Sequence, residues 1–471
     1  MRRVSLIFLS LFFFSVVLGY DSKLRFEQPI PFTQSYERLF GYENNPVLYA
    51  DWFGKSKYFF GVSAGRFLND FRRTYDPRET RNYALVYDNL KCLSERHLIA
   101  TSVSYYRSDL LKQYRSLEKA FYDNYFSIID TTVGNFVYDG PVLTFLDVFM
   151  PATHVYAGFL VNYGVERGLK DVFTKCETIA RNFDVSFGAG LKLKRLFISA
   201  YGRYLSNQRK YEAVKEYQDA NVSTFYGFNV LRIESPRTTV RKNYYSEGYE
   251  FGSHCKIKGK AGNSISISFT RGSRYSDIEV GSPSKPLERG YWVRNGDVLE
   301  ALIRKRVLSW SDFEIYYRFS SFEDWAESSE YHVVILENDE KYNFLGAGIK
   351  VTPSNKLFFV LRLGYGEKNV DYREYNSGFE FADKLQEERF LFSTGYKLNQ
   401  LYRLKCEGEI SHFEPYFYWD CNEMESCGFE LGIERLTIYG YSGVSVGVLQ
   451  TSPVGLDDNI KSFKVEFTLS K

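Results

Sequence analysis

The feature that most constrains this chain is an alternation of apolar and polar residues that recurs throughout residues 57–470. Near the C-terminus, for example, Phe463, Val465 and Phe467 alternate with the polar residues between them. A period of two predicts β-strands that have one apolar face. Several segments keep the pattern for about 10 to 13 residues, whereas strands of soluble proteins usually have about 5 or 6. The longer segments suit tilted strands that cross a bilayer.

We therefore predict an all-β fold, a transmembrane antiparallel up-and-down β-barrel of about 18 strands, with a range of roughly 14–18. The predicted strands are 57–67, 81–92, 96–107, 141–149, 154–165, 181–193, 196–206, 247–258, 263–275, 297–306, 309–320, 341–352, 355–367, 388–399, 401–413, 427–435, 438–450 and 460–470. A soluble β-sandwich would also alternate, with its apolar face turned inward, and is the competing interpretation.

The connections between the predicted strands favour the barrel. Tight turns such as 93–95 and 150–153 alternate with longer connections. The longer ones are predicted to be extracellular loops: 68–80, 108–140, 166–180, 207–246, 276–296, 321–340, 368–387, 414–426 and 451–459. A Greek-key sandwich is not expected to sort its loops so regularly. Within two of these loops, residues 110–125 and 209–218 carry apolar side chains at helical spacing and are predicted to be helical.

Aromatic residues make up 18% of the chain, with 39 Tyr and 41 Phe. Tyr residues lie at the ends of predicted strands, where interfacial aromatic girdles of membrane barrels occur. They are Tyr105, Tyr106, Tyr316, Tyr317, Tyr365, Tyr439 and Tyr441. The charged residues are balanced, with a net charge of +2, so the sequence gives no electrostatic reason to expect a nucleic-acid partner.

The N-terminus has the pattern of a secretory signal peptide, predicted over residues 1–19. Arg2 and Arg3 precede an apolar stretch, and Asp21 follows it. A transmembrane anchor is the alternative interpretation of this stretch. Residues 20–56 are predicted to be an N-terminal extended segment, in the lumen of the barrel or below it, and 57–471 to be the outer-membrane β-barrel. No later run of about 18 apolar residues predicts a helical membrane crossing.

Ionisable residues on the polar side of the predicted strands are the candidate lumen-lining set. They are Lys192, Lys194, Asp312, Glu314, Arg318, Lys356, Arg362, Lys405, Glu407, Glu409, Glu430, Glu434, Lys464 and Glu466. Charges enclosed in a barrel must be paired or hydrated. Because both signs occur, the set predicts cross-strand ion pairs and a partly filled interior. A solvated wall without selectivity is the alternative.

Few residues suggest other chemistry. Cys421 and Cys427 bracket a predicted outer loop, and either a disulfide between them or two free thiols is compatible with an exported chain. The Cys and His spacings match no metal site, and no catalytic motif is present. We therefore expect no cofactor, no metal and no catalytic residue, and hence no enzymatic activity. An outer-membrane hydrolase is the remote alternative.

Taken together, the chain resembles the uncharacterised outer-membrane β-barrel families of diderm bacteria, which are porin- or transporter-like. The signal at 1–19, the segment YERLFGYENNPVLYADWFG (36–54) and the strands up to Ser470 carry this resemblance. Asn45-Pro46 is similar to the Asn-Pro segment that opens fatty-acid-transporter-like barrels, in which the N-terminal piece folds into the lumen. The C-terminus departs from the pattern, because it ends in Leu469-Ser470-Lys471 and lacks the terminal aromatic residue of many such barrels.

The resemblance implies a location in the bacterial outer membrane, contact with outer-membrane lipid and insertion by the barrel-assembly machinery. It also implies a porin- or transporter-like channel for small or amphipathic solutes. The alternative is a non-transporting scaffold or adhesin that binds partners through the long extracellular loops 108–140 and 207–246.

Overall fold

The chain folds into one sheet of antiparallel strands in a computed structural model, which describes residues 44–470 except 55, 120, 171–173, 215–220, 235–238, 355, 400, 438–439 and 455–459. The predicted signal peptide and most of the N-terminal segment lie outside the described residues. The strands are β1 (Lys57–Asn69), β2 (Glu79–Ser94), β3 (His97–Ser116), β4 (Ile128–Ala152), β5 (Val155–Lys170), β6 (Lys175–Leu193), β7 (Leu196–Val214), β8 (Val222–Tyr226), β9 (Val230–Glu234), β10 (Thr239–Lys258), β11 (Ser264–Ser282), β12 (Lys285–Leu308), β13 (Ser311–Ser328), β14 (Val333–Ser354), β15 (Leu357–Glu374), β16 (Phe379–Lys397), β17 (Tyr402–Phe413), β18 (Met424–Thr437), β19 (Gly440–Pro453) and β20 (Ile460–Ser470).

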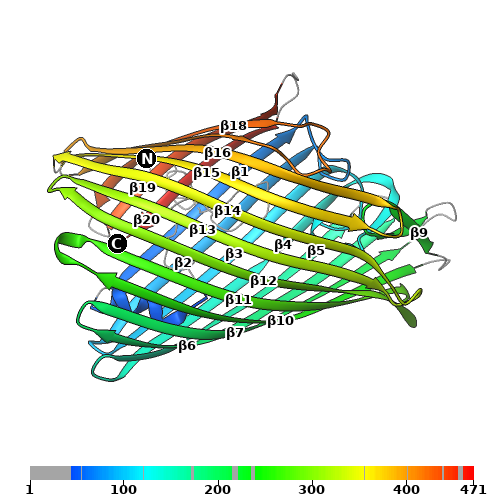
Figure 1. Ribbon diagram of the computed structural model, residues 1–471. Helices are drawn as coiled ribbons and strands as arrows, with labels where there is room; N and C mark the ends of the chain where they lie inside the picture. The colour runs from blue at the N-terminus through cyan, green and yellow to red at the C-terminus, as the bar shows by residue number, and fades with distance from the viewer. Residues whose placement is uncertain are drawn as a thin grey trace, which may run out of the picture.

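The sheet closes on itself. Each wall strand pairs with its neighbours along the chain, and β1 pairs with β20, for example through Gly61 and Thr468. All 20 strands belong to this sheet, but β8 and β9 form an inserted hairpin, and β7 pairs directly with β10. The wall is therefore an 18-stranded closed barrel, as predicted (Figure 1). Closure leaves no unpaired strand edge.

Each predicted strand coincides with one wall strand, but the outer ends were placed too early. The segments 166–180, 276–296, 321–340 and 368–387, predicted as long loops, are mostly strand, because neighbouring wall strands continue to pair well beyond the expected boundary. β11 and β12, for example, pair as far as Ser282 and Lys285. The turn predicted at 150–153 lies instead at Thr153 and His154, where His154 has a φ of 77°.

The two helical predictions were wrong in the described residues, except that 121–123 form a single 3-10 turn. β3 continues to Ser116 and β7 to Val214. In β3 the register shifts twice, and Lys112 and Arg115 adopt positive φ angles of 53° and 58°. Such β-bulges insert extra residues into a strand and break its period of two. The broken alternation explains why the sequence of β3 resembles a helical pattern.

The exterior of the barrel carries an apolar belt. On β15, the outward residues Phe359, Leu361 and Leu363 are exposed, and Tyr365 follows them at the edge of the belt. Nine residues from Leu357 to Tyr365 extend roughly 26 Å along the strand. A tilt of about 40° reduces this to roughly 20 Å of height, close to the ~25 Å apolar band of membrane barrels. Apolar surface of this extent suits lipid, so the sandwich interpretation is excluded.

Of the seven Tyr residues proposed for the girdle, Tyr105 and Tyr365 face outward and are exposed. Tyr317 also faces outward, because it lies two residues from outward Phe319 on the same face of the strand, but it is half-buried. Tyr106 and Tyr316 face inward, because their hydroxyls donate to Glu166 and Glu300 at 2.7 Å each. The side chains of residues 439 and 441 lie outside the described part of the chain.

Beyond the belt the wall continues as a polar collar. On β15 the outward positions after Tyr365 are Glu367, Asn369, Asp371 and Arg373. Figure 1 shows that these extended strands and the inserted β9 lie at one end, opposite the end of the tight turns. We call the two ends the loop end and the turn end.

At the turn end, a short 3-10 helix, η2 (Pro46–Trp52), occupies the lumen. Val47 is fully buried in a cluster with Leu90, Leu98 and Leu146 on the inner wall. The Asn45 side chain caps η2 through Val47 N and donates to Ser199 Oγ at 3.0 Å. This part of the N-terminal segment is therefore inside the lumen and helical rather than extended.

The wall leaves room for η2 by means of glycines. A Cβ at Gly188 would lie 2.8 Å from Asn45 Oδ1 and 3.0 Å from Pro46 Cδ, closer than real Cβ contacts.

Among the described residues, no helix is long and apolar enough to span a membrane.

Candidate functional site

Segments from the loop end fold inward and cover the lumen. We call them the cap: residues 117–127 with the 3-10 helix η3 (Phe121–Asp123), the β8–β9 hairpin, and residues 415–419. Leu117 and Phe126 are fully buried, and Tyr226 is 3% exposed. Of the loops proposed to bind partners, 108–140 therefore consists largely of wall strand, and 207–246 contributes wall strand at both ends with the β8–β9 hairpin between them. Tyr226 of the hairpin is buried, whereas Leu231 and Ile233 are exposed.

The hairpin crosses the lumen from one side to the other. At one side β8 pairs with β4 through Ile128 and Thr224. At the other side Glu374 on β15 accepts hydrogen bonds from the backbone of Phe228 and Asn229 at 3.2 and 3.0 Å. β4 and β15 stand opposite each other in the ring of 18 wall strands. The barrel is thus bridged at its full width.

Gly227 lets the hairpin turn fit against Glu374. Its φ is +81°, in the left-handed region that favours glycine, and an added Cβ would lie 2.5 Å from Glu374 Cδ. The turn and the wall carboxylate therefore form one closely fitted contact.

Three buried ion pairs also involve the loop end. Lys242 on β10 bonds Glu118 of the cap at 2.6 Å and also donates to the Phe126 carbonyl at 2.7 Å. Arg289 on β12 bonds Glu234 of the hairpin at 2.6 Å. Lys170 and Asp130, 2.5 Å apart, join β5 to the base of the cap loop on β4. All six side chains are at most 6% exposed, so each pair leaves no charge unbalanced in the interior.

Aromatic rings fill the space between these polar contacts. Phe228 at the hairpin tip stacks on Tyr372 of β15 and lies edge-on to Tyr125. Tyr125 in turn lies edge-on to Trp292 of β12. Burial is the main reason that the pKa of the Tyr122 hydroxyl in η3 is raised above its ordinary value, so this group stays neutral.

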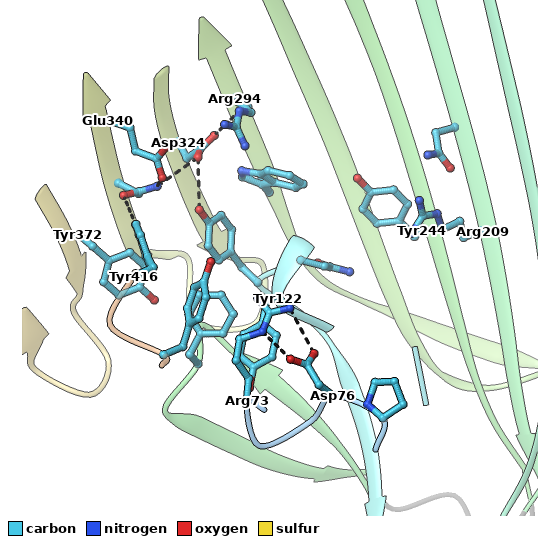
Figure 2. A pocket seen from close by; sticks show the side chains of 18 of the residues that line it. Arg73, Asp76, Tyr122, Arg209, Tyr244, Arg294, Asp324, Glu340, Tyr372 and Tyr416 are labelled. Carbon is cyan, nitrogen blue, oxygen red and sulfur yellow. Dashed lines mark hydrogen bonds and ion pairs between the residues drawn. The ribbon is translucent and has the colours of Figure 1, made fainter. Parts of the chain in front are cut away.

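A cavity of about 460 Å³ lies beneath the cap. Tyr122, Tyr125 and Phe228 of the cap line it on one side, and Figure 2 shows Arg209, Tyr244, Arg294 and Asp324 of the wall around it. The volume is in the range of about 300–1,000 Å³ that small-molecule sites occupy. Aromatic rings and polar or charged side chains contribute about equally to the lining, so the cavity is more polar than most small-molecule sites.

The acidic groups of the cavity are already paired. Asp76 bonds Arg73 at 2.8 Å, and Asp324 lies 3.6 Å from Arg294 and accepts from the Tyr125 hydroxyl at 3.3 Å. Glu340 bonds Lys368 at 3.0 Å. The basic residues Arg209 and Arg274 also line the cavity. Neither forms an ion pair with any residue in the described ranges.

The structure places most of the candidate lumen residues on inward strand positions, many of them in ion pairs. Arg362 bonds Glu314 at 2.6 Å, Arg318 lies 3.6 Å from Glu300, and Lys405 bonds Glu434 at 2.8 Å. Asp312 bonds Arg306, Glu409 lies near Arg389, Lys464 pairs with Glu466, and Glu407 accepts from Ser393. Lys192 and Glu430 also alternate with outward apolar residues.

Two candidates do not lie on the wall. Lys194 and Lys356 occupy tight turns and are exposed. None of the candidates lines the cavity; the residues that do include Arg209, Tyr244, Arg274, Arg294 and Asp324. The sequence assigned all of these except Arg274 to loops, because the predicted strands ended too early; Arg274 fell at the end of the predicted strand 263–275. Extending the alternation outward from each strand would have placed them on the inner face.

The two predicted loop cysteines are free thiols. Cys427 is exposed on β18, whereas Cys421 packs against a cluster of Phe71, Met424 and Ile460. Of the two alternatives, the structure therefore has the free thiols. No group of His, Cys, Asp and Glu that could hold a metal occurs among the described residues.

No protein-family model matches the chain. A search of curated proteins found no match either. Among solved structures, the chain is similar to the outer membrane transporter YddB from Escherichia coli, at 8% identity over 89% of this chain and 81% of that one, with a TM-score of 0.39.

It is also similar to the siderophore receptor PiuA from Acinetobacter baumannii, at 7% identity over 88% and 82%, with a TM-score of 0.44. The ferric yersiniabactin uptake receptor FyuA from Yersinia pestis aligns at 7% identity over 88% and 80%, with a TM-score of 0.42. These likenesses are too distant to assign a ligand to this chain.

Proposed function

We propose that this protein is a bacterial outer-membrane barrel that takes up small, amphipathic solutes through a capped lumen. The observation that carries the proposal is the cavity of about 460 Å³ between an inserted cap and the barrel wall. An open porin would need a continuous water-filled passage, whereas here the β8–β9 hairpin bridges the lumen. The barrel is therefore proposed to be gated.

The apolar belt supports the membrane location, because exposed Phe359, Leu361 and Leu363 would be unfavourable in water. With an even number of wall strands, both ends of the wall lie at the turn end, which we assign to the periplasm. The polar collar and cap then face outward. The proposed function is transport without catalysis. Cell fractionation and heat-modifiable migration on a gel test the location and the fold.

Conductance in planar bilayers tests the proposed gating. The full chain is expected to show low conductance, and a variant in which Val222–Glu234 is replaced by a short Gly-Ser linker is expected to conduct several-fold more. A matched control replaces Pro283 and Ser284, which connect β11 to β12 at the same end, by two glycines; its conductance should equal that of the unaltered chain.

Liposome swelling with small sugars and amino acids gives a second measure of the same opening. A hairpin-deleted barrel that inserts correctly, as judged by heat-modifiable migration, yet neither conducts nor admits solutes would contradict the proposal. Increased conductance of the glycine control would show instead that any alteration at the loop end opens the lumen.

A further inference from the structure

Arginines gather on one side of the capped cavity. Arg274 on β11 stands directly opposite Arg294 on β12 in the strand register, and Arg209 lies on β7. Arg274 interacts electrostatically with both of these and with Arg203. Like charges at directly opposed positions of two strands destabilise a sheet. The wall therefore keeps an arrangement that costs stability.

The partners of these arginines differ. Arg203 is held by Asp184 at 3.1 Å and Glu250 at 3.3 Å, and Arg294 is balanced by Asp324. Within the described ranges, Arg209 and Arg274 have no carboxylate at ion-pair distance. Arg209 Nε is buried without a hydrogen-bond partner. Arg209 still interacts electrostatically with the Glu166 carboxylate, whereas the positive charge of Arg274 is left for water or for a ligand to satisfy.

The space beside Arg274 is open. Its side chain faces the lumen and is exposed to water. Its opposite neighbour on β10 is Gly248, which has no side chain to fill the adjacent volume. Asn207, which also lines the cavity, is neutral and adds no negative charge beside the arginines. An anionic group can therefore approach the Arg274 guanidinium directly.

Aromatic rings line the cavity beside the arginines, together with polar side chains such as Asn124 and Asn338. Tyr244 and Trp292 of the wall and Phe228 of the cap line it together with the arginines. Guanidinium groups bind planar carboxylates and phosphates through paired hydrogen bonds, and aromatic rings accept the apolar part of a solute. The carboxylates of the cavity do not compete for the same place, since Asp76, Asp324 and Glu340 have their own basic partners.

We infer that the cavity binds an aromatic organic anion, with its carboxylate or phosphate at Arg209 and Arg274 and its ring against the aromatic lining. This inference rests on the proposed function, since it names the class of solute that the capped lumen takes. A neutral amphipathic solute would leave Arg274 without a counter-charge.

Calorimetric titration of the detergent-solubilised full chain tests the inference. The probes are phenyl phosphate and benzoate, which separate the two anionic groups, inorganic phosphate, which lacks the ring, and benzyl alcohol, which lacks the charge. Phenyl phosphate or benzoate is expected to bind more tightly than either inorganic phosphate or benzyl alcohol. Arg274→Gln should weaken the aromatic anion at least about tenfold, because a charge-assisted hydrogen bond is lost.

Arg271→Gln is the matched control. Arg271 lies three residues away on β11, but its side chain is 76% exposed, on the outward face with Phe269. This variant should bind the anions as the unaltered chain does. Since Arg274→Gln removes a like-charge contact, it is expected to fold with normal heat-modifiable migration. Arg209→Gln is a second variant with the same expected loss.

Equal binding of an aromatic anion by the Arg274→Gln variant and the unaltered chain would overturn the inference. So would an equal loss in Arg271→Gln, or inorganic phosphate bound as tightly as phenyl phosphate. If benzyl alcohol binds and enters liposomes while the anions do not bind, the inference fails and the proposed function stands. If no probe binds and the hairpin-deleted barrel does not conduct, both fail.

Discussion

The two ends of the lumen are closed in different ways. At the turn end, η2 is held mainly by apolar contacts of Val47 with the inner wall. At the loop end, the cap is held by apolar contacts of Leu117 and Phe126 and, in addition, by buried ion pairs and by hydrogen bonds that the hairpin backbone donates to Glu374. Apolar contacts lose their stabilisation on exposure to water, whereas polar groups can exchange their protein partners for water. The cap is therefore the closure better suited to opening and closing.

The directional contacts also make the cap sensitive to single changes. Glu118 accepts from both Lys242 and the Ile128 backbone, so its loss would free two donors at once. Val47 instead makes many small contacts, none of which depends on one geometry. The comparison predicts a large effect at the cap and smaller effects at η2.

The largest effect is expected from breaking the Lys242–Glu118 pair from one side. Lys242→Met leaves the buried Glu118 carboxylate without its cation, which costs about 3–5 kcal/mol. Hydrogen exchange should show loss of protection in residues 117–127, and bilayer conductance should rise. In the double variant with Glu118→Leu, much of the ion-pair cost should disappear. If the cap amides of Lys242→Met exchange as slowly as those of the unaltered chain, the ion pair does not hold the cap.

A smaller effect is expected at η2. Val47→Ala removes two buried methyl groups and should lower the stability of η2 docking by about 1–2.5 kcal/mol, from the burial and cavity terms together. Protease sensitivity near η2 should increase, while hydrogen exchange of the cap should not change. A simultaneous loosening of the cap would show that the two closures are coupled.

A smaller effect still is expected from Asn45→Ala. The variant loses the N-cap of η2 and the hydrogen bond to Ser199, which together are worth about 1 kcal/mol. Asn45→Asp, which keeps the N-cap acceptor of η2 but cannot donate to Ser199, serves as the comparison. If Asn45→Asp and Asn45→Ala lower the midpoint of unfolding equally, the hydrogen bond from Val47 N to the N-cap side chain contributes nothing.

The smallest effect is expected in the rate at which a thiol reagent labels Cys421, which lies beside the cap. Burial raises the pKa of this thiol to about 11, so at pH 8 only about a thousandth of it is the reactive thiolate. Labelling by a thiol reagent should be slow, should accelerate as the pH rises towards 11, and should be faster at pH 8 in Lys242→Met. Unchanged labelling in that variant would mean that Cys421 does not sense the cap. Cys427→Ser removes the exposed thiol for this measurement.

Much of the barrel could be predicted from local pattern. Phe463, Val465 and Phe467 alternate with polar residues and face outward on β20, as expected for a strand with one face in lipid. The tight turns were placed nearly correctly because turn residues act locally. The outer strand ends were missed, since outward residues such as Glu367 and Asp371 are polar and the contrast between the faces fades there.

The candidate site could be predicted far less well. The mixed charges of the lumen indicated ion pairs, and pairs such as Arg362–Glu314 exist. Arg274 lies at the end of the predicted strand 263–275, and its lack of an ion-pair partner depends on the neighbouring strands β10 and β12, which the local pattern does not identify. The crossing of the hairpin to Glu374 joins residues about 145 positions apart, a separation that no local pattern encodes.

By itself, the sequence determined that this chain forms strands with one apolar and one polar face, and the regular sorting of its connections favoured a barrel over a sandwich. The reason is physical: a period of two depends only on neighbouring residues, and contact with lipid stabilises an apolar outer face on every strand. Only the tertiary structure decided what fills the barrel. Which loops turn inward, and which charges remain without partners, depends on contacts across the lumen between distant strands.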